Sequence, residues 1–145
     1  MKFISHSVEE TAGLALKFLQ SIVTSPSSKT TVVALYGDLG SGKTTFSQAL
    51  GRHLGITDFM TSPTFVIQKN YALDSKNFFK QLIHIDAYRL EGGQELQTLG
   101  FEKLLVDPGN LILIEWPEKV SDILPANSTS LHFKFISENE REIIF

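Results

Sequence analysis

Apolar positions along the chain follow two different periods, one typical of helices and the other of strands. From Val8 to about Val23 they recur at intervals of three and four residues, which predicts a helix with one buried stripe. Ser7 and Glu10 have the spacing of a capping box, in which a hydroxyl and a carboxylate satisfy free amides of the first turn. We expect the buried stripe to consist of Val8, Ala12, Ala15, Leu19 and Ile22.

Two further segments are apolar along nearly their whole length. Thr31–Tyr36 and Asn110–Glu115 are rich in aliphatic residues without polar alternation, the pattern of strands covered on both faces in a parallel sheet. The first segment ends in Gly37 and precedes a predicted helix over Lys43–Leu54, with Gly55 as a left-handed cap. A strand, a glycine-rich turn and a helix therefore follow one another in this part of the chain.

Shorter elements are predicted on either side. Lys2–Ser5 is typical of a strand, and Ser25–Ser28 breaks the first helix. The other expected elements are an antiparallel strand pair at Phe65–Tyr71 and Phe78–Asp86, a weak helix over Gln94–Leu105, a short helix around Glu118–Ile123 and a closing strand pair at Ser130–Ile136 and Glu142–Phe145. Because no linker or internal repeat separates these elements, we expect a single domain over residues 1–145.

Composition and charge narrow the class of protein. A chain of 145 residues can bury one sizeable core and is too short for a second large domain. The net charge of −3 excludes a broad basic field for nucleic acid, so action on RNA would need a partner. The absence of cysteine excludes disulfides, thiolate zinc sites and a cysteine nucleophile. No apolar run approaches the ~20 residues of a membrane helix, and no secretory signal is present, so we expect a cytoplasmic protein without a membrane role.

The chemistry is concentrated in Gly37–Thr44, which matches the phosphate-binding loop pattern G-x-x-x-x-G-K-[ST]. Glycines let backbone amides curve around a phosphate, and the following helix start adds a partial positive charge. Lys43 should reach the β- and γ-phosphates, and the Thr44 hydroxyl should bind Mg²⁺. The alternative is an ordinary glycine-rich turn with an exposed lysine. A dinucleotide fingerprint fails because Thr45 lies where a third glycine would be needed.

A nucleotide hydrolase of this type also needs an acid at the carboxyl end of a neighbouring strand. Asp86 and Glu115 each end a predicted strand. One could hold the Mg²⁺ shell, and the other could orient or deprotonate the attacking water. The sequence leaves open which acid has which role, and each could instead be a solvated charge at a strand end.

Three other residues have a functional and a structural interpretation. Thr64 follows a proline in the loop where such proteins carry a γ-phosphate switch, or it belongs to a plain turn. Trp116 could stack on a base or fill a partner's pocket, or it could be a core residue. Arg89 could stabilise transition-state charge, although an ordinary ion pair is the simpler interpretation.

Histidines and arginines mainly exclude other functions. The four histidines are too scattered for a metal site, so core or surface roles are expected for His6, His53, His84 and His132. The scarcity of arginine, limited to Arg52, Arg89 and Arg141, argues against a small-molecule kinase, which would clamp two charged substrates.

Four segments together resemble the bacterial TsaE (YjeE) ATPase family of tRNA threonylcarbamoyladenosine synthesis. They are Gly37–Thr45 (GDLGSGKTT), Thr61–Phe65 (TSPTF), His84–Leu90 (HIDAYRL) and Ile114–Glu118 (IEWPE). The phosphate loop alone is shared by very many proteins, whereas the other three segments are far more specific. Family members often have alanine where Ser41 stands, a difference that should leave the loop intact.

The resemblance implies an α/β P-loop fold, with a central sheet of parallel and antiparallel strands flanked by helices, and a weak Mg²⁺-dependent ATPase. It implies TsaB and TsaD as partners in modifying adenosine 37 of tRNAs that read codons beginning with A, with tRNA reached through those partners. Catalytic roles would fall to Lys43, Asp86 and Glu115, and metal contacts to Thr44, Glu115 and Asp86. The residues expected at the nucleotide are Asp38, Leu39, Gly40, Ser41, Gly42, Lys43, Thr44, Thr45, Thr64 and Trp116.

Two hypotheses about function share this site. In the first, the protein is an ATP hydrolase that serves tRNA modification. In the second, it is a nucleotide-gated interaction switch whose hydrolysis is incidental. They differ in whether tRNA modification survives the loss of turnover.

Overall fold

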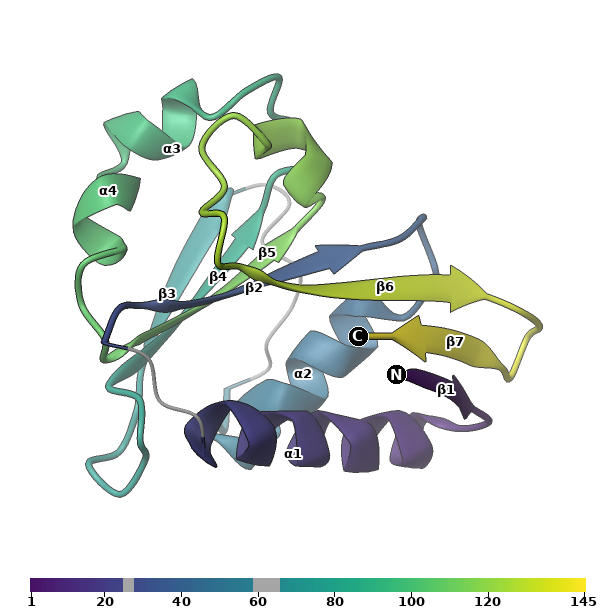
Figure 1. The fold of residues 1–145 in the computed structure, drawn as a ribbon. Coiled ribbons are helices and arrows are strands. Elements are labelled where there is room, and N and C mark those ends of the chain that lie inside the picture. Colours follow the sequence, from purple (N-terminus) through teal and green to yellow (C-terminus); the bar gives the residue numbers. More distant parts are fainter. Residues whose placement is uncertain (25–27, 59–65) are drawn as a thin grey trace.

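The two apolar strands predicted from the sequence lie inside a seven-stranded mixed sheet (Figure 1). In the computed structural model, which describes residues 1–24, 28–58 and 66–145, β2 (Thr31–Tyr36) pairs in parallel with β5 (Asn110–Glu115). On the far side of β5, β4 (Gln81–Asp86) is also parallel, and on the other side of β2 lies β6 (Thr129–Phe135). The predicted α/β class with a mixed sheet is confirmed.

Antiparallel strands complete the sheet on both sides, in the order β1-β7-β6-β2-β5-β4-β3. β3 (Gln68–Ala72) pairs with β4, and β7 (Arg141–Ile144) pairs with β6, as predicted in both cases. β1 (Lys2–Ser5) pairs with β7, which brings the two chain ends together. This last pairing was not among the predictions.

Different helices cover the two faces of the sheet. α1 (Val8–Thr24) and α2 (Lys43–His53) lie side by side on one face, where Phe18 and Phe46 pack edge to face with ring centroids 5.8 Å apart. The opposite face of the β2, β5 and β4 region is covered by α3 (Gln94–Thr98), α4 (Phe101–Leu104) and the 3-10 helix η1 (Pro117–Val120). Each face thus buries its own apolar cluster.

Some predicted details differ from the structure. On α1, Val8 is 57% exposed, whereas Leu14 and Phe18 are buried, so the predicted stripe is wrong in part. The weak helix predicted over Gln94–Leu105 is two short helices, because Gly100 between them adopts a left-handed φ of 88°. The short helix around Glu118 is one turn of 3-10 helix.

The bounds of the predicted strand pair are also corrected: β3 and β4 begin at Gln68 and Gln81, later than predicted. Phe65 lies outside the described residues, as does most of the predicted Ser25–Ser28 break. Within the described part of the chain, no helix has the length and apolar character needed to cross a bilayer.

Candidate active site

The glycine-rich loop connects the end of β2 to the first turn of α2. Gly37, Gly40 and Gly42 all have positive φ values, of 148°, 78° and 107°. A Cβ on Gly37 would lie 2.5 Å from the carbonyl oxygen of Phe133, so only glycine fits at the start of the loop. α2 begins without a side-chain cap, which leaves its first amides available to an anion.

Lys43 is the first residue of α2, and its side chain is almost completely buried, at 5% exposure. Its ammonium donates hydrogen bonds to the carbonyl oxygens of Gly37 and Asp38, the latter at 3.0 Å. It also lies 4.2 Å from the centroid of the Trp116 ring, in cation–π geometry. Burial lowers the pKa of Lys43, although nearby carboxylates, Glu115 first among them, act in the opposite direction.

The two strand-end acids lie side by side, because Asp86 of β4 is in register with Glu115 of β5. Both are buried, at 4% and 2% exposure. The Thr44 hydroxyl donates to Oε1 of Glu115 at 3.2 Å, and Oδ1 of Asp86 accepts the backbone N–H of Tyr88 at 2.9 Å. The predicted convergence of the phosphate loop with these acids is thus present in the fold.

These oxygen donors suit Mg²⁺ in their chemistry. Mg²⁺ prefers hydroxyl and carboxylate oxygens and usually keeps several waters while binding phosphate, so it does not need a complete protein cage. Among the described residues there is no group of three or more histidine, cysteine or acidic side chains arranged for a metal. The Thr44 hydroxyl and the carboxylates of Glu115 and Asp86 therefore fit Mg²⁺ held jointly with a nucleotide better than a closed structural metal site.

A cavity of about 580 Å³ opens beside the loop. This volume is in the range of sites for small ligands and cofactors. Its walls are the phosphate loop and α2 start, the β4 and β5 ends with Tyr88 and Trp116, and the α1 start facing the β6–β7 hairpin. The lining residues include Leu39, Gly40, Ser41, Gly42, Lys43, Thr44, Thr45, Asp86, Glu115 and Trp116.

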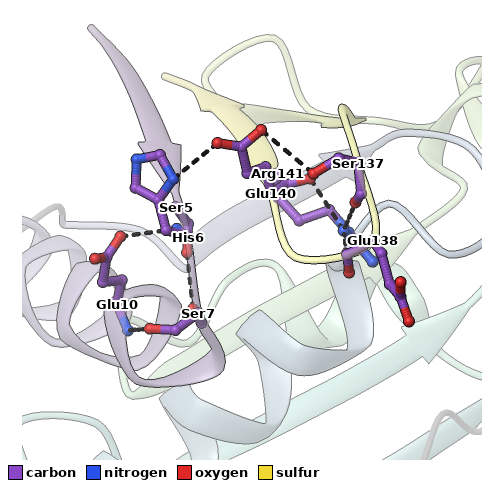
Figure 2. Close-up of polar contacts among 8 residues, drawn as sticks. All are labelled: Ser5, His6, Ser7, Glu10, Ser137, Glu138, Glu140 and Arg141. Carbon is purple, nitrogen blue, oxygen red and sulfur yellow. Dashed lines mark hydrogen bonds and ion pairs between the residues drawn. The ribbon is translucent and has the colours of Figure 1, made fainter.

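Polar contacts join the α1 start to the β6–β7 hairpin (Figure 2). The capping box has its expected first contact, in which the Glu10 N–H donates to Ser7 Oγ at 3.1 Å. The Glu10 carboxylate accepts the N–H of His6 at 2.8 Å, and the His6 ring contacts Glu140 of the hairpin at 3.0 Å. This wall of the cavity is therefore built from segments far apart in sequence.

Arg141 is a site residue that the sequence analysis counted but did not assign. Its Nε donates to the carbonyl oxygen of Gly40 at 3.1 Å, and Nη1 donates to the carbonyl oxygen of Ser137 at 2.7 Å. The same side chain thus connects the phosphate loop to the hairpin and lines the cavity. No local pattern could have indicated this contact, since it joins residues about a hundred positions apart.

The other predicted residues divide into those at the site and those elsewhere. Asp38 takes part through its backbone carbonyl, while Trp116 is half-buried at the cavity, with its ring centroid 5.0 Å from that of Tyr88. Arg89 is exposed and does not line the cavity. Thr64 lies outside the described residues.

His84 is buried, within the range of roles expected for it, and it also contacts the site, with Nε2 2.8 Å from Oε2 of Glu115. The sequence analysis did not connect it with this acid. The signal that could have found it is its position two residues before Asp86 on the same strand, which directs both side chains to one face.

The chain is similar in sequence to known proteins of one family. Residues 5–143 match the family model of TsaE, described as threonylcarbamoyl adenosine biosynthesis protein TsaE. The tRNA threonylcarbamoyladenosine biosynthesis protein TsaE of Rickettsia felis is 37% identical over 139 residues, which cover 95% of this chain and 75% of that protein. The protein of the same name from Bacillus subtilis is 38% identical over 114 residues, covering 79% and 68%. The crystal structure of Bacillus subtilis YdiB is similar with a TM-score of 0.74 and 29% identity, over 99% of this chain and 82% of that one.

Proposed function

The chain belongs to the TsaE family of threonylcarbamoyl adenosine biosynthesis proteins, and on this premise we propose that it is a Mg²⁺-dependent ATPase that serves tRNA modification. The ATPase would be a single domain over residues 1–145. One observation supports this most: a buried lysine, a hydroxyl and two buried carboxylates converge on one cavity at the glycine-rich loop.

Phosphate binding would use groups that line the cavity. The uncapped amides at the start of α2 and the loop glycines with positive φ would supply backbone donors to the phosphates. Lys43 is held close to the loop by two carbonyl oxygens, and a phosphate would offer its ammonium a charged acceptor. Arg141 supports the loop from outside by binding the Gly40 carbonyl.

The two acids would have different roles, one at the metal and the other at the attacking water. Thr44 and Glu115 are in direct contact and would hold Mg²⁺, which supplies positive charge to the phosphates when bound. Asp86 would orient the attacking water and accept its proton. The water oxygen would form a bond to the γ-phosphorus while the bond from that phosphorus to the β–γ bridging oxygen breaks, releasing ADP and inorganic phosphate.

The rest of the cavity would receive the nucleoside. The space between the α1 start and the β6–β7 hairpin continues from the phosphate loop and is lined by Val8, Thr11 and Asn139. Trp116 lies beside Lys43 at the phosphate end and would exclude water there. Thr64 would lie in the switch segment, as the resemblance implies, and its hydroxyl would sense the γ-phosphate there.

The partners follow from the family. The curated relatives are named for tRNA threonylcarbamoyladenosine biosynthesis, and we propose that this chain acts there with TsaB and TsaD in the cytoplasm. A net charge of −3 supports contact with tRNA through partners, because phosphate contacts need basic side chains. ATP would favour the docked state, and hydrolysis would release it.

Calorimetry with Mg·ATP tests the nucleotide site directly. We expect the folded protein to bind Mg·ATP and Lys43→Met to weaken binding by about 10–100-fold, the loss that removal of a charged hydrogen bond produces. Lys17→Met, which removes an exposed lysine on α1, is the control and should bind like the parent chain. No heat of binding with any magnesium nucleotide would end the proposal.

A further inference from the structure

We propose that His84 is a positioning residue that holds the Glu115 carboxylate in the orientation needed for Mg²⁺, an inference that rests on the proposed nucleotide site. His84 lies in the middle of β4 and is fully buried. Its strand neighbours Ile83 and Ile85 belong to the apolar cluster on the opposite face of the sheet. His84 and Asp86 therefore share the face that carries α2 and the phosphate loop.

Two contacts restrain the carboxylate of Glu115, one at each oxygen. Nε2 of His84 lies 2.8 Å from Oε2, and the Thr44 hydroxyl lies 3.2 Å from Oε1. The first partner comes from the sheet and the second from α2. A carboxylate held by two elements cannot rotate without losing one hydrogen bond, so its orientation is set before a ligand arrives.

The surroundings of His84 indicate which ring nitrogen carries the proton. Nδ1 is buried and has no hydrogen-bond partner among the described residues. A proton there would leave a buried donor unsatisfied, whereas a proton on Nε2 is donated to the carboxylate of Glu115. The arrangement therefore favours a proton on Nε2, the nitrogen that faces Glu115.

The restraint matters because Asp86 and Glu115 lie side by side, in register on neighbouring strands, and both are buried. An N–H donor at Oε2 fixes that oxygen and leaves Oε1 directed toward Thr44, the other residue proposed to hold Mg²⁺. Partners of metal-binding side chains typically change metal affinity by 10–100-fold when removed.

Two substitutions of His84 separate the donor from the space that it fills. His84→Leu removes the N–H, whereas His84→Gln offers an amide N–H at a similar distance along the side chain. We expect His84→Leu to lower the Mg²⁺-dependent gain in ATP affinity by about 10–100-fold, with Mg²⁺-free nucleotide affinity unchanged. His84→Gln should restore most of that gain. Calorimetric titrations of ATP with and without Mg²⁺ measure both quantities.

Leu82→Val is the matched control, because Leu82 is buried on the same strand and the same face, away from the acids. It should lower the melting temperature and leave the Mg²⁺ dependence intact. An equal loss of Mg²⁺ dependence in Leu82→Val, or none in His84→Leu, would refute the positioning role.

A second measurement needs neither a variant nor a nucleotide. Long-range ¹H–¹⁵N NMR spectra of the ligand-free protein distinguish the two tautomers, and we expect His84 to carry its proton on Nε2. A proton on Nδ1 alone would overturn the inference. If the parent chain binds no nucleotide, the proposed function fails, while this spectrum still decides whether His84 donates to Glu115.

Discussion

At the scale of single residues, Lys43 of the candidate site lies where burial makes its positive charge unfavourable. Its side chain is almost fully buried between the loop carbonyls and the Trp116 ring. Charged groups in such places are poorly solvated, and burial accordingly lowers the pKa of this lysine. Without a ligand, Lys43 should therefore reduce the stability of the fold that positions it.

The stability of Lys43→Met relative to the parent chain tests this cost. Because the folded state lowers the pKa of Lys43 below 10.5, unfolding takes up protons between the two pKa values, and stability rises with pH there. The loss of stability caused by burying the charged lysine is present in full below the folded-state pKa, and it disappears as the pH approaches 10.5. We expect ligand-free Lys43→Met to be more stable than the parent at pH 7, by a margin that narrows toward pH 10.5. Urea unfolding at several pH values measures this margin.

Lys17→Met controls for the change in composition, and the difference in stability between this variant and the parent should not depend on pH in this way. If the difference in stability between Lys43→Met and the parent stayed constant with pH, burial of the charge could not be its cause.

The residues of the candidate site were predictable from sequence to different degrees. Lys43 and Thr44 lie in a local motif, and Asp86 and Glu115 end apolar strands, so the topology of a parallel sheet is enough to bring them together. Arg141 reaches the loop from the other end of the chain. Such a contact depends on how β7 is placed beside the loop, which no local pattern specifies.

At the scale of elements, the sequence predicted which segments are helices and strands better than which side of each is buried. α1 ends one residue from the predicted position, but Leu14 and Phe18 face the core and Val8 faces the cavity. The rotation of a helix about its axis is decided by its partner, here α2 and the ring of Phe46. Gly100 shows a similar effect, since its left-handed φ divides a segment of continuous weak helical pattern.

The β2–α2 connection supports a prediction about Gly37. Gly37→Ala would have to accommodate a Cβ 2.5 Å from the Phe133 carbonyl oxygen in addition to its unfavourable φ of 148°. Gly55 has a φ of 85° but open space around a Cβ, so Gly55→Ala should lose only about 1–2 kcal/mol from backbone strain. We expect Gly37→Ala to lose more than twice as much stability as Gly55→Ala and to lose Mg·ATP binding as well.

Thermal unfolding and calorimetry of the two alanine variants measure both effects. Comparable stability in the two variants would show that the loop can move away from β6 and that close contact does not decide its shape.

At the scale of the whole molecule, the cavity is assembled from segments that are distant along the chain. The α1 start contacts the β6–β7 hairpin through His6 and Glu140, and the hairpin contacts the phosphate loop through Arg141. β1 and β7 join the two chain ends in one antiparallel pair. These non-local pairings were not predictable, because the end strands are short and the sequence pattern does not specify their neighbours. The same pairings link the cavity to the β6–β7 hairpin and the chain ends through continuous contacts, by which a nucleotide in the cavity could change the conformation of these surface segments.

The proposed coupling of hydrolysis to tRNA modification depends on Asp86. Asp86→Asn keeps an oxygen for the N–H of Tyr88 but removes the base, so we expect Mg·ATP affinity to change only several-fold and turnover to fall by about 10²–10⁴-fold. Asp74→Asn, at an exposed turn between β3 and β4, is the control for loss of one carboxylate. Phosphate release from the purified protein measures turnover. The threonylcarbamoyladenosine content of tRNA from cells that carry each variant measures modification.

If the chain acts as a hydrolase, modification should fall with turnover in Asp86→Asn and remain normal in Asp74→Asn. Normal modification in a variant that binds ATP without turnover would instead favour the nucleotide-gated switch. Binding to the TsaB–TsaD complex separates the steps further, because coupling energy can arise only from a difference between nucleotide states. We expect the ATP-bound form to bind that complex at least tenfold more tightly than the ADP-bound form, and Asp86→Asn to remain bound after ATP is added. Equal binding of the two nucleotide forms would exclude a cycle driven by hydrolysis.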